Sequence, residues 1–165
     1  MAKVLLTGSF DPITRGHFAM IKAASRAFDE VVVCMFINPD KTYMFDQSDR
    51  LMFIREGVAE LGLLNVTVDF SEGYVADYAK MRGIPFVARG VRNADDMAYE
   101  LEMARYNHNR NSELETWFWA STLEESGISS TAVRRFLKDG VLPNDMLLSS
   151  TAKLIGEIMN KGELY

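Results

Sequence analysis

One short segment near the N-terminus gathers several groups that can bind an anion. It runs from Thr7 to His17 and contains Gly8, Ser9 and Gly16. Glycine lets the backbone turn and approach a ligand closely, and Ser9 adds a hydroxyl group. His17 is expected in the first turn of a helix, where free N–H groups and the positive end of the helix dipole favour phosphate. The segment therefore predicts a phosphate site to which His17 donates a hydrogen bond.

The alternative for His17 is an exposed residue at a helix start with no ligand. A lone histidine would favour that interpretation. The longer pattern Gly-Ser-Phe-Asp-Pro-x-Thr-x-Gly-His favours a built site, because so long a combination seldom recurs by chance.

Further cationic and hydroxyl groups come after apolar runs elsewhere in the chain. Lysine is a mobile point charge, and arginine is a planar fork suited to phosphate oxygens. Hydroxyl groups at a helix start can cap the helix or bind an anion. The alternative for two arginines three residues apart is a pair on a surface exposed to water, with no ligand. The residues concerned are Lys41, Arg89, Arg92, Ser129, Ser130 and Thr131.

The elements that must position these groups alternate between strands and helices. This alternation predicts an α/β fold with one domain over residues 1–165. Its sheet is expected to be doubly wound, with five parallel strands. In such sheets ligands bind at the carboxyl ends of the strands. We expect strands over 3–6, 31–37, 66–70, 85–88 and 116–120, and helices over 17–28, 48–61 (capped by Ser48), 73–81, 95–107, 129–138 and 145–160.

The composition narrows the function. The chain has 165 residues, which fits one domain, and a net charge of -5, which argues against duplex nucleic acid. Its one cysteine, Cys34, lies in an apolar run and is expected to be buried and unreactive. No apolar run reaches the roughly 20 residues of a membrane span, and no signal segment is visible, so we expect a cytoplasmic protein.

Several common site types lack their motifs. The sequence contains no phosphate-loop motif, no G-x-G-x-x-G turn and no G-x-S-x-G elbow. One cysteine and two distant histidines make a zinc site improbable. A Ser-His-Asp hydrolase is compatible with the composition, although no motif supports it.

The segment 7–17 resembles the signature of the T/H-x-G-H nucleotidyltransferases, and specifically the phosphopantetheine adenylyltransferase family. The match continues in order through most of the chain, with departures at Thr7, where the family usually has proline, and at 125–127, where it commonly has an aromatic pair. The matching segments are Asn38-Pro39-Asp40-Lys41, Arg89-Gly90-Val91-Arg92, Tyr99-Glu100 and Ile128-Ser129-Ser130-Thr131.

This resemblance implies an enzyme that joins ATP and 4'-phosphopantetheine into dephospho-coenzyme A and pyrophosphate. It also implies Mg²⁺ bound mainly through ATP phosphates, self-association to a homohexamer, and no nucleic-acid or membrane partner. His17 would be catalytic, and Ser9, Lys41, Val75 and Arg89 would bind the acceptor. ATP would contact Ser9, Phe10, His17, Gly90, Val91, Arg92, Glu100, Glu125, Ser126, Gly127, Ile128, Ser129, Ser130 and Thr131.

Two other functions remain open on sequence alone. One is a related adenylyl- or cytidylyltransferase that acts on a mononucleotide or on a sugar or polyol phosphate. The other is a regulator that binds a nucleotide or coenzyme A without catalysis. His108 matches no family motif, and we expect it at the surface or at a subunit contact.

Overall fold

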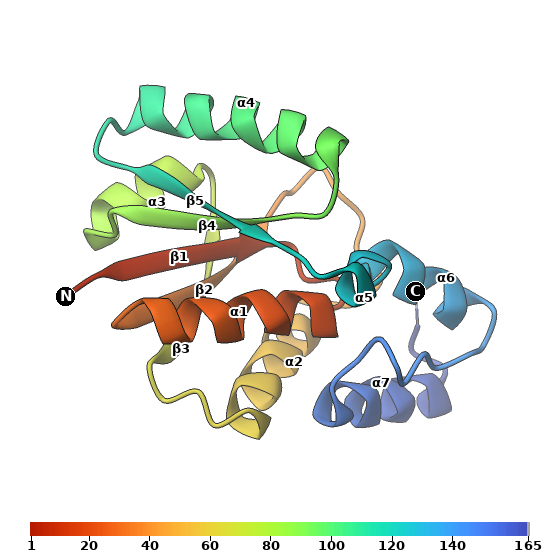
Figure 1. Ribbon diagram of the computed structural model, residues 1–165. Coiled ribbons are helices and arrows are strands. Elements are labelled where there is room, and N and C mark those ends of the chain that lie inside the picture. Colours follow the sequence, from red (N-terminus) through yellow and green to blue (C-terminus); the bar gives the residue numbers. More distant parts are fainter. Residues whose placement is uncertain (165) are drawn as a thin grey trace.

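A five-stranded parallel sheet forms the centre of the protein (Figure 1). The computed structural model describes residues 1–164; Tyr165, the last residue of the predicted domain, lies outside the described residues. The strand order is β3-β2-β1-β4-β5, so the chain winds from β1 to one edge and returns to the other. The predicted doubly wound α/β fold is confirmed. The strands are β1 (Lys3–Gly8), β2 (Glu30–Ile37), β3 (Val66–Glu72), β4 (Phe86–Val91) and β5 (Glu115–Ala120).

Helices cover both faces of this sheet. Four of them share one hydrophobic core with one face of the sheet, and a second core lies on the opposite face. Figure 1 shows the two helical layers on either side of the strands. The first layer contains α1 (Arg15–Ala27), α2 (Gln47–Glu60), α6 (Ser130–Lys138) and α7 (Ser149–Lys161); the second contains α3 (Val75–Arg82) and α4 (Ala94–Arg110).

Strand β2 shows why its sequence is a continuous apolar run. Val31, Val33 and Met35 face the core beneath α1 and α2, whereas Val32 and Cys34 face the core beneath α3. A strand of a parallel sheet is covered on both faces, so both sets of alternating positions are apolar. Burial raises the pKa of Cys34 to about 12, which keeps its thiol protonated and unreactive as expected.

The predicted cap of α2 is wrong. The capping residue is Asp46, whose Oδ1 atom accepts hydrogen bonds from the backbone nitrogen of Asp49 at 2.8 Å and from the hydroxyl of Ser48 at 2.8 Å. Ser48 therefore supports the cap from inside the helix. An ionised carboxylate accepts both bonds at once and complements the helix dipole, which a serine hydroxyl does less well.

The last helix starts later than predicted, at Ser149 instead of residue 145. The chain first makes tight turns around Pro143, in which Met146 donates its backbone N–H to the Pro143 carbonyl at 3.0 Å. The Met146 carbonyl then accepts the backbone N–H of Arg15 at 2.9 Å. This bond holds the segment against the start of α1, where a continuous helix could not offer a free carbonyl.

The fourth strand continues to Val91, beyond the predicted end at residue 88. It continues because the pairing with β5 extends along its whole length, up to Val91 opposite Ala120. Arg89, Gly90 and Val91 are thus the last residues of a strand, and only Arg92 comes after it. Strand geometry gives these side chains fixed directions on opposite faces of the sheet.

Within residues 1–164 no helix is both long enough and apolar enough to cross a bilayer.

Gly57 allows a close contact between two helices that the sequence did not predict. A Cβ atom at this position of α2 would lie 2.0 Å from Cζ of Phe18 on α1, which is far inside van der Waals contact. Gly156 in α7 is a helical glycine with room for a side chain, because an added Cβ atom would meet only Leu142, at 3.6 Å.

We therefore expect Gly57→Ala to lower the free energy of unfolding by about 1–3 kcal/mol through overpacking. Gly156→Ala should raise it by up to about 1 kcal/mol, the helix-propensity gain of alanine over glycine. Denaturant titrations followed by circular dichroism measure both. A Gly57→Ala protein as stable as Gly156→Ala would contradict the packing of α1 on α2.

Candidate active site

The carboxyl ends of β1 and β4 open into a cavity of about 390 Å³. These strands are neighbours at the middle of the sheet, where the connections diverge to opposite edges. Doubly wound folds bind ligands at such a switch point. Most residues predicted for the site line this cavity: Ser9, Phe10, His17, Arg89, Gly90, Val91, Arg92, Glu125, Ile128, Ser129, Ser130 and Thr131.

The loop after β1 takes its turn at Phe10. Phe10 has a left-handed backbone with φ 48°, whereas Gly8, for which we predicted the tight turn, ends β1. Gly8 is needed for another reason, because a Cβ atom there would lie 3.0 Å from the Phe10 ring. The ring thus folds back over the end of β1 and forms part of the cavity wall.

Hydrogen bonds fix the protonation of His17. Its Nδ1 atom lies 3.1 Å from the backbone nitrogen of Thr14 and 2.9 Å from the Thr14 hydroxyl oxygen. A backbone N–H can only donate, so Nδ1 accepts and the neutral ring carries its proton on Nε2. The ring packs edge-on against Phe10, with centroids 5.3 Å apart. His17 can therefore offer an Nε2–H donor to a ligand in the cavity.

The surroundings keep this imidazole neutral. Burial, together with the positive charges of Arg89 and Arg92, lowers the pKa of His17 to about 4. A second proton on Nδ1 would also face the donating N–H of Thr14. At neutral pH the ring is a hydrogen-bond donor without a charge of its own.

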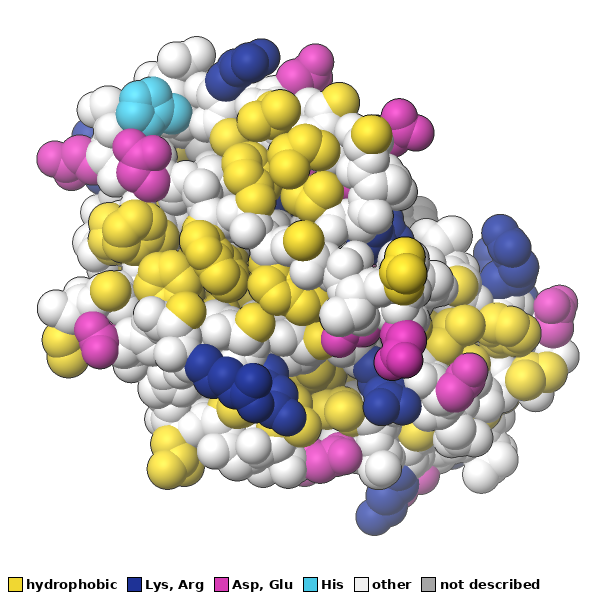
Figure 2. Space-filling view, viewed as in Figure 1, with side chains coloured by type: hydrophobic (Ala, Val, Ile, Leu, Met, Phe, Trp, Pro, Cys, Tyr) yellow, Lys and Arg dark blue, Asp and Glu magenta, His cyan; other side chains and the backbone are white. Residues whose placement is uncertain are grey.

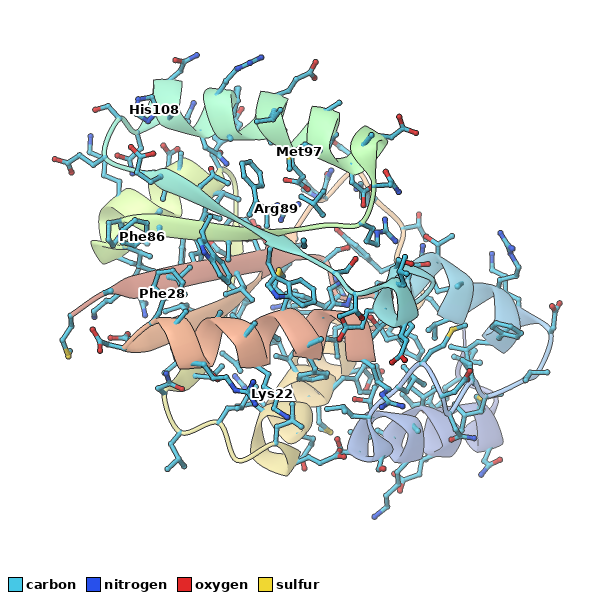
Figure 3. The ribbon with its side chains drawn as sticks, viewed as in Figure 1. Lys22, Phe28, Phe86, Arg89, Met97 and His108 are labelled. Carbon is cyan, nitrogen blue, oxygen red and sulfur yellow. The ribbon has the colours of Figure 1, made fainter. Side chains whose placement is uncertain are left out.

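Arg89 is held at both ends of its guanidinium group. Its Nε and Nη2 atoms donate to the two carboxylate oxygens of Glu100, each at 2.8 Å. Its Nη1 atom donates to the Thr7 hydroxyl at 2.8 Å and to the Thr7 carbonyl at 3.0 Å. Figure 3 labels Arg89, whose side chain lies between β4 and the α4 helix that carries Glu100.

Arg92 lines the same cavity with a looser partner. Its Nε atom donates to Asp96 Oδ2 at 2.9 Å, four residues along the chain. This hydrogen bond lowers the pKa of Asp96. The pair is more exposed than Arg89 and Glu100, with 41% of the Arg92 side chain accessible. Water and ligands can therefore compete for this guanidinium group.

The three hydroxyl residues at the start of α6 each have a separate partner. Ser129 caps the helix, since its Oγ accepts from the backbone nitrogen of Ala132 at 3.1 Å. The Ser130 hydroxyl donates to the Pro12 carbonyl at 2.8 Å, and the Thr131 hydroxyl accepts from Arg134 at 3.2 Å. The start of α6 is thereby tied to the loop after β1.

Lys41 lines an adjoining cavity of about 360 Å³ that shares Ser9 with the first. Arg134 and Lys138 lie there as well, so the second cavity is cationic. Asp11 attaches the segment beyond Lys41 to the loop after β1, because its carboxylate accepts from the backbone nitrogens of Met44 at 2.9 Å and Phe45 at 3.0 Å. Lys41 is therefore placed beside Ser9 and outside the cavity that His17 lines.

Besides Lys41, four more predicted site residues do not line the cavity of His17. Glu100 is 6% exposed and contacts Arg89. Val75 begins α3 and packs against the second core. Ser126 donates to the carbonyl of Leu123 within a short helix, α5 (Leu123–Ser126). Gly127 lines a different cavity of about 600 Å³ beside α1. Their predicted ligand contacts stay predictions.

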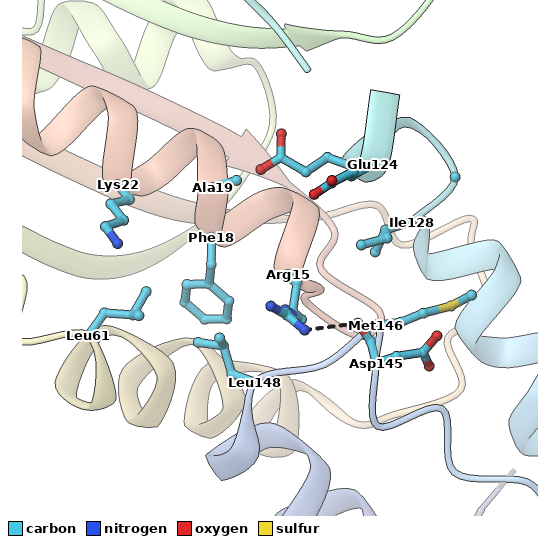
Figure 4. Close-up of a pocket in the computed structure, with 12 residues that line it drawn as sticks. Arg15, Phe18, Ala19, Lys22, Leu61, Glu124, Ile128, Asp145, Met146 and Leu148 are labelled. Atoms are coloured by element: carbon cyan, nitrogen blue, oxygen red, sulfur yellow. Dashed lines mark hydrogen bonds between the residues drawn. The ribbon is translucent and has the colours of Figure 1, made fainter. Parts of the chain in front are cut away.

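That larger cavity borders the site from outside (Figure 4). Glu125 and Ile128 line both cavities, so α5 and the residues after it form the wall between them. Helix α5 was not predicted from the sequence, although its signal is present: Thr122 and Glu125 form a capping box, with hydrogen bonds of 3.1 and 3.3 Å.

Several residues that hold the site in place were not predicted from the sequence. Arg50 is 2% exposed and donates to the Ser9 carbonyl at 2.8 Å. Thr14, Asp11 and Thr7 act through the contacts described above. A Thr-x-x-His spacing at a helix start is similar to a capping box and could have indicated Thr14. Contacts such as Arg50 to Ser9 join distant segments and have no local signal.

Comparisons with known proteins agree on one family. Residues 5–136 match the model of the cytidylyltransferase-like family. The phosphopantetheine adenylyltransferase of Clostridium novyi (strain NT) is 34% identical over 98% of this chain and 97% of its own length. That of Streptococcus pneumoniae (strain ATCC 700669 / Spain 23F-1) is 39% identical over 95% and 94%.

Solved structures support the fold. A Plasmodium falciparum nicotinic acid mononucleotide adenylyltransferase complexed with NaAD superposes with a TM-score of 0.71 at 15% identity, covering 95% of this chain and 96% of that one. A bifunctional NMN adenylyltransferase/ADP ribose pyrophosphatase from Francisella tularensis gives 0.74 at 14%, covering 96% and 50%. At such low identity these likenesses establish the fold alone.

Similarity to curated relatives over nearly the whole chain, together with a histidine, two arginines and three hydroxyl residues around one cavity, leads to one assignment: the chain belongs to the phosphopantetheine adenylyltransferases of the cytidylyltransferase-like family.

Proposed function

We propose that the protein transfers the adenylyl group of ATP to 4'-phosphopantetheine, which yields dephospho-coenzyme A and pyrophosphate. An oxygen of the acceptor phosphate forms a bond to the α-phosphorus, and the bond from that phosphorus to the bridging oxygen breaks as pyrophosphate leaves. The acceptor is already an anion, so no general base is required. The observation that carries the proposal is the neutral His17 donor in a cavity that also contains Arg89 and Arg92.

His17 stabilises the charge that develops on the α-phosphoryl group. A donor aimed at developing charge lowers the barrier most when it is held before the reaction starts. The Thr14 backbone N–H supplies this order, because it fixes the ring and leaves the proton on Nε2. A neutral donor also avoids an ion pair that would hold the reactant phosphate too firmly.

The remaining cations divide between the two substrates. Arg92 and the start of α6, with Ser129, Ser130 and Thr131, hold the phosphates of ATP, since free backbone N–H groups at a helix start favour anions. Lys41 and Arg89 hold the acceptor phosphate, and Val75 contacts its pantetheine arm. Ser9 lies on the boundary of the two cavities and contacts both substrates. ATP is further bound by Phe10, Gly90, Val91, Glu100 and residues 125–128.

Mg²⁺ accompanies ATP in this proposal and neutralises part of the phosphate charge. The described residues 1–164 contain no group of three or more His, Cys, Asp or Glu side chains that could cage a metal. A Mg²⁺ ion bound through phosphate oxygens and water needs no such cage. The proposed reaction belongs in the cytoplasm, where ATP is available.

We also propose that the chain assembles into a homohexamer. Exposed apolar side chains lie on two sides of α4: Leu101, 40% exposed, lies beside β5, and Tyr106, 44% exposed, packs against Tyr74. Figure 2 shows apolar side chains gathered over α4 and along the neighbouring edge of the sheet. Apolar patches of this kind are typical of contacts between proteins.

A panel of phosphorylated acceptors tests the proposed reaction. With ATP and Mg²⁺, we expect pyrophosphate release with 4'-phosphopantetheine and not with nicotinamide mononucleotide, glycerol 3-phosphate or ribose 5-phosphate. Chelation of Mg²⁺ should abolish the release. Turnover of a mononucleotide or polyol phosphate instead would assign the chain to another acceptor. Tight ATP binding without any release would indicate a regulator.

Substitution of His17 tests the catalytic role. We expect His17→Ala to lower kcat by about a hundredfold to a thousandfold, the usual effect of losing one preorganised donor. His108→Ala removes the other histidine, on the exposed side of α4, and should leave kcat within about twofold. Steady-state pyrophosphate assays measure both, and near-normal turnover of His17→Ala would refute the role.

The lowered pKa of His17 predicts a pH dependence. The ring stays neutral down to about pH 4, so the wild-type rate should show no transition near pH 6.5 that depends on His17. The pH profiles of the wild type and of His17→Gln should therefore have the same shape around pH 6.5. In the unfolded chain the histidine titrates near 6.5, so the unfolded state takes up a proton before the folded state does. The contribution of the neutral ring to the free energy of unfolding is therefore complete above pH 6.5 and is lost as the pH falls toward 4. Denaturant titrations at pH 7 and pH 5 should show that the free energy of unfolding falls more between these two pH values for the wild type than for His17→Gln.

Light scattering coupled to gel filtration tests the assembly. We expect a particle with the mass of six chains of 18.6 kDa. Leu101→Lys with Tyr106→Lys should shift the protein to smaller species, because charged groups would be buried at the contact. A wild-type monomer would refute the hexamer.

A further inference from the structure

Arg89 has few hydrogen-bond donors left for a ligand. Its guanidinium group carries five N–H groups. Two of them bond to Glu100 and two to Thr7. Among the described residues 1–164, no partner is assigned to the second N–H of Nη2, although Arg89 lines the cavity. A phosphate bound by Arg89 must therefore meet a donor whose direction the other four bonds determine.

We propose that Thr7 is a positioning residue, whose hydroxyl acts with Glu100 to aim the free N–H of Arg89 at the acceptor phosphate. The proposal rests on the function proposed above. Glu100 holds the Nε and Nη2 edge of the guanidinium group, and Thr7 holds Nη1 at the opposite side. Two anchors on opposite sides fix both the plane of the group and its rotation within that plane.

The Thr7 hydroxyl is the part of this arrangement that depends on residue type. Thr7 is 8% exposed at the end of the central strand, where its carbonyl would be present with any amino acid. Its hydroxyl adds the shorter of the two bonds to Nη1, at 2.8 Å against 3.0 Å for the carbonyl. Without it, one Nη1 hydrogen would lose its partner, and the group could turn toward the cavity.

Preorganisation is the physical gain. An arginine side chain carries considerable rotamer freedom, and a ligand that must order it binds less tightly. Glu100 neutralises the charge, and without the hydroxyl the far end of the group would be held by the Thr7 carbonyl alone. The bond to the Thr7 hydroxyl restricts this end further before the substrate arrives, so the acceptor phosphate meets a donor that already points at it.

The kinetic test uses Thr7→Val, which keeps the shape and removes only the hydroxyl. We expect the KM for 4'-phosphopantetheine to rise about tenfold, the usual effect of one hydrogen bond to a charged group, while the KM for ATP stays within about twofold. Thr7→Ser should restore the wild-type value. Thr67→Val, a threonine of β3 far from the cavity, is the matched control and should change neither constant.

A double mutant separates positioning from general damage. Lysine at position 89 cannot form the forked contacts. In an Arg89→Lys background, Thr7→Val should therefore raise the acceptor KM no further. A merely structural role of Thr7 would lower the yield of active enzyme and leave both KM values unchanged.

A measurement without any acceptor keeps the test independent of the proposed function. In ¹⁵N-labelled wild-type protein, slow rotation of the Arg89 guanidinium group should give resolved Nη signals in NMR spectra. Thr7→Val should merge or broaden the Nη1 pair, and Thr7→Ser should not. An unchanged Arg89 spectrum would overturn the proposal, as would a changed spectrum with an unchanged acceptor KM. A wild type that does not adenylylate 4'-phosphopantetheine would overturn the role in catalysis, whereas the spectra would still decide whether Thr7 restrains Arg89.

Discussion

A single buried carboxylate holds together the segments that carry the site. Asp11 accepts the backbone N–H groups of Met44 and Phe45, and its own carbonyl accepts from Arg134 on α6 at 2.6 Å. The loop after β1, the segment that contains Lys41, and α6 therefore meet at one residue. Asp11 is 5% exposed, and each of its carboxylate oxygens has a donor, as a buried polar group requires. The geometry of both cavities depends on this cross-link.

In the site, positive charge and an oriented hydrogen-bond donor come from different residues. The two arginines supply positive charge, and each has a carboxylate partner on α4. His17 supplies direction without charge, because burial, the nearby arginines and the Thr14 N–H keep it neutral. Had the ring been protonated, it would have added a third cation to the cavity and lost its bond to Thr14. The imidazole is useful here as an oriented dipole.

Local patterns in the sequence were enough to predict the strands and the edge of the sheet that carries the site. Apolar runs such as 31–37 indicated strands, and polar groups placed after β1 and β4 indicated the edge where His17 and Arg92 meet, because parallel strands end on the same side. Contacts between distant elements could not be predicted in this way. The pairing of Arg89 with Glu100 depends on how α4 packs on β4, and the position of Lys41 depends on the carboxylate of Asp11. Neither is encoded by spacing alone.

The two arginines differ in a way that fits an in-line transfer between two anions. Glu100 is buried, its side chain 8% exposed, and contacts Arg89 through both oxygens, so a phosphate cannot displace it without leaving a charge unpaired in the protein. Asp96 is 26% exposed and can return to water when a phosphate takes Arg92. Arg89 therefore acts as a fixed donor, while Arg92 can exchange one anion for another. In the proposed reaction, an exchangeable cation is needed on the side of the leaving pyrophosphate, and Arg92 lines the cavity together with Ser130 and Thr131, to which the proposal assigns the ATP phosphates.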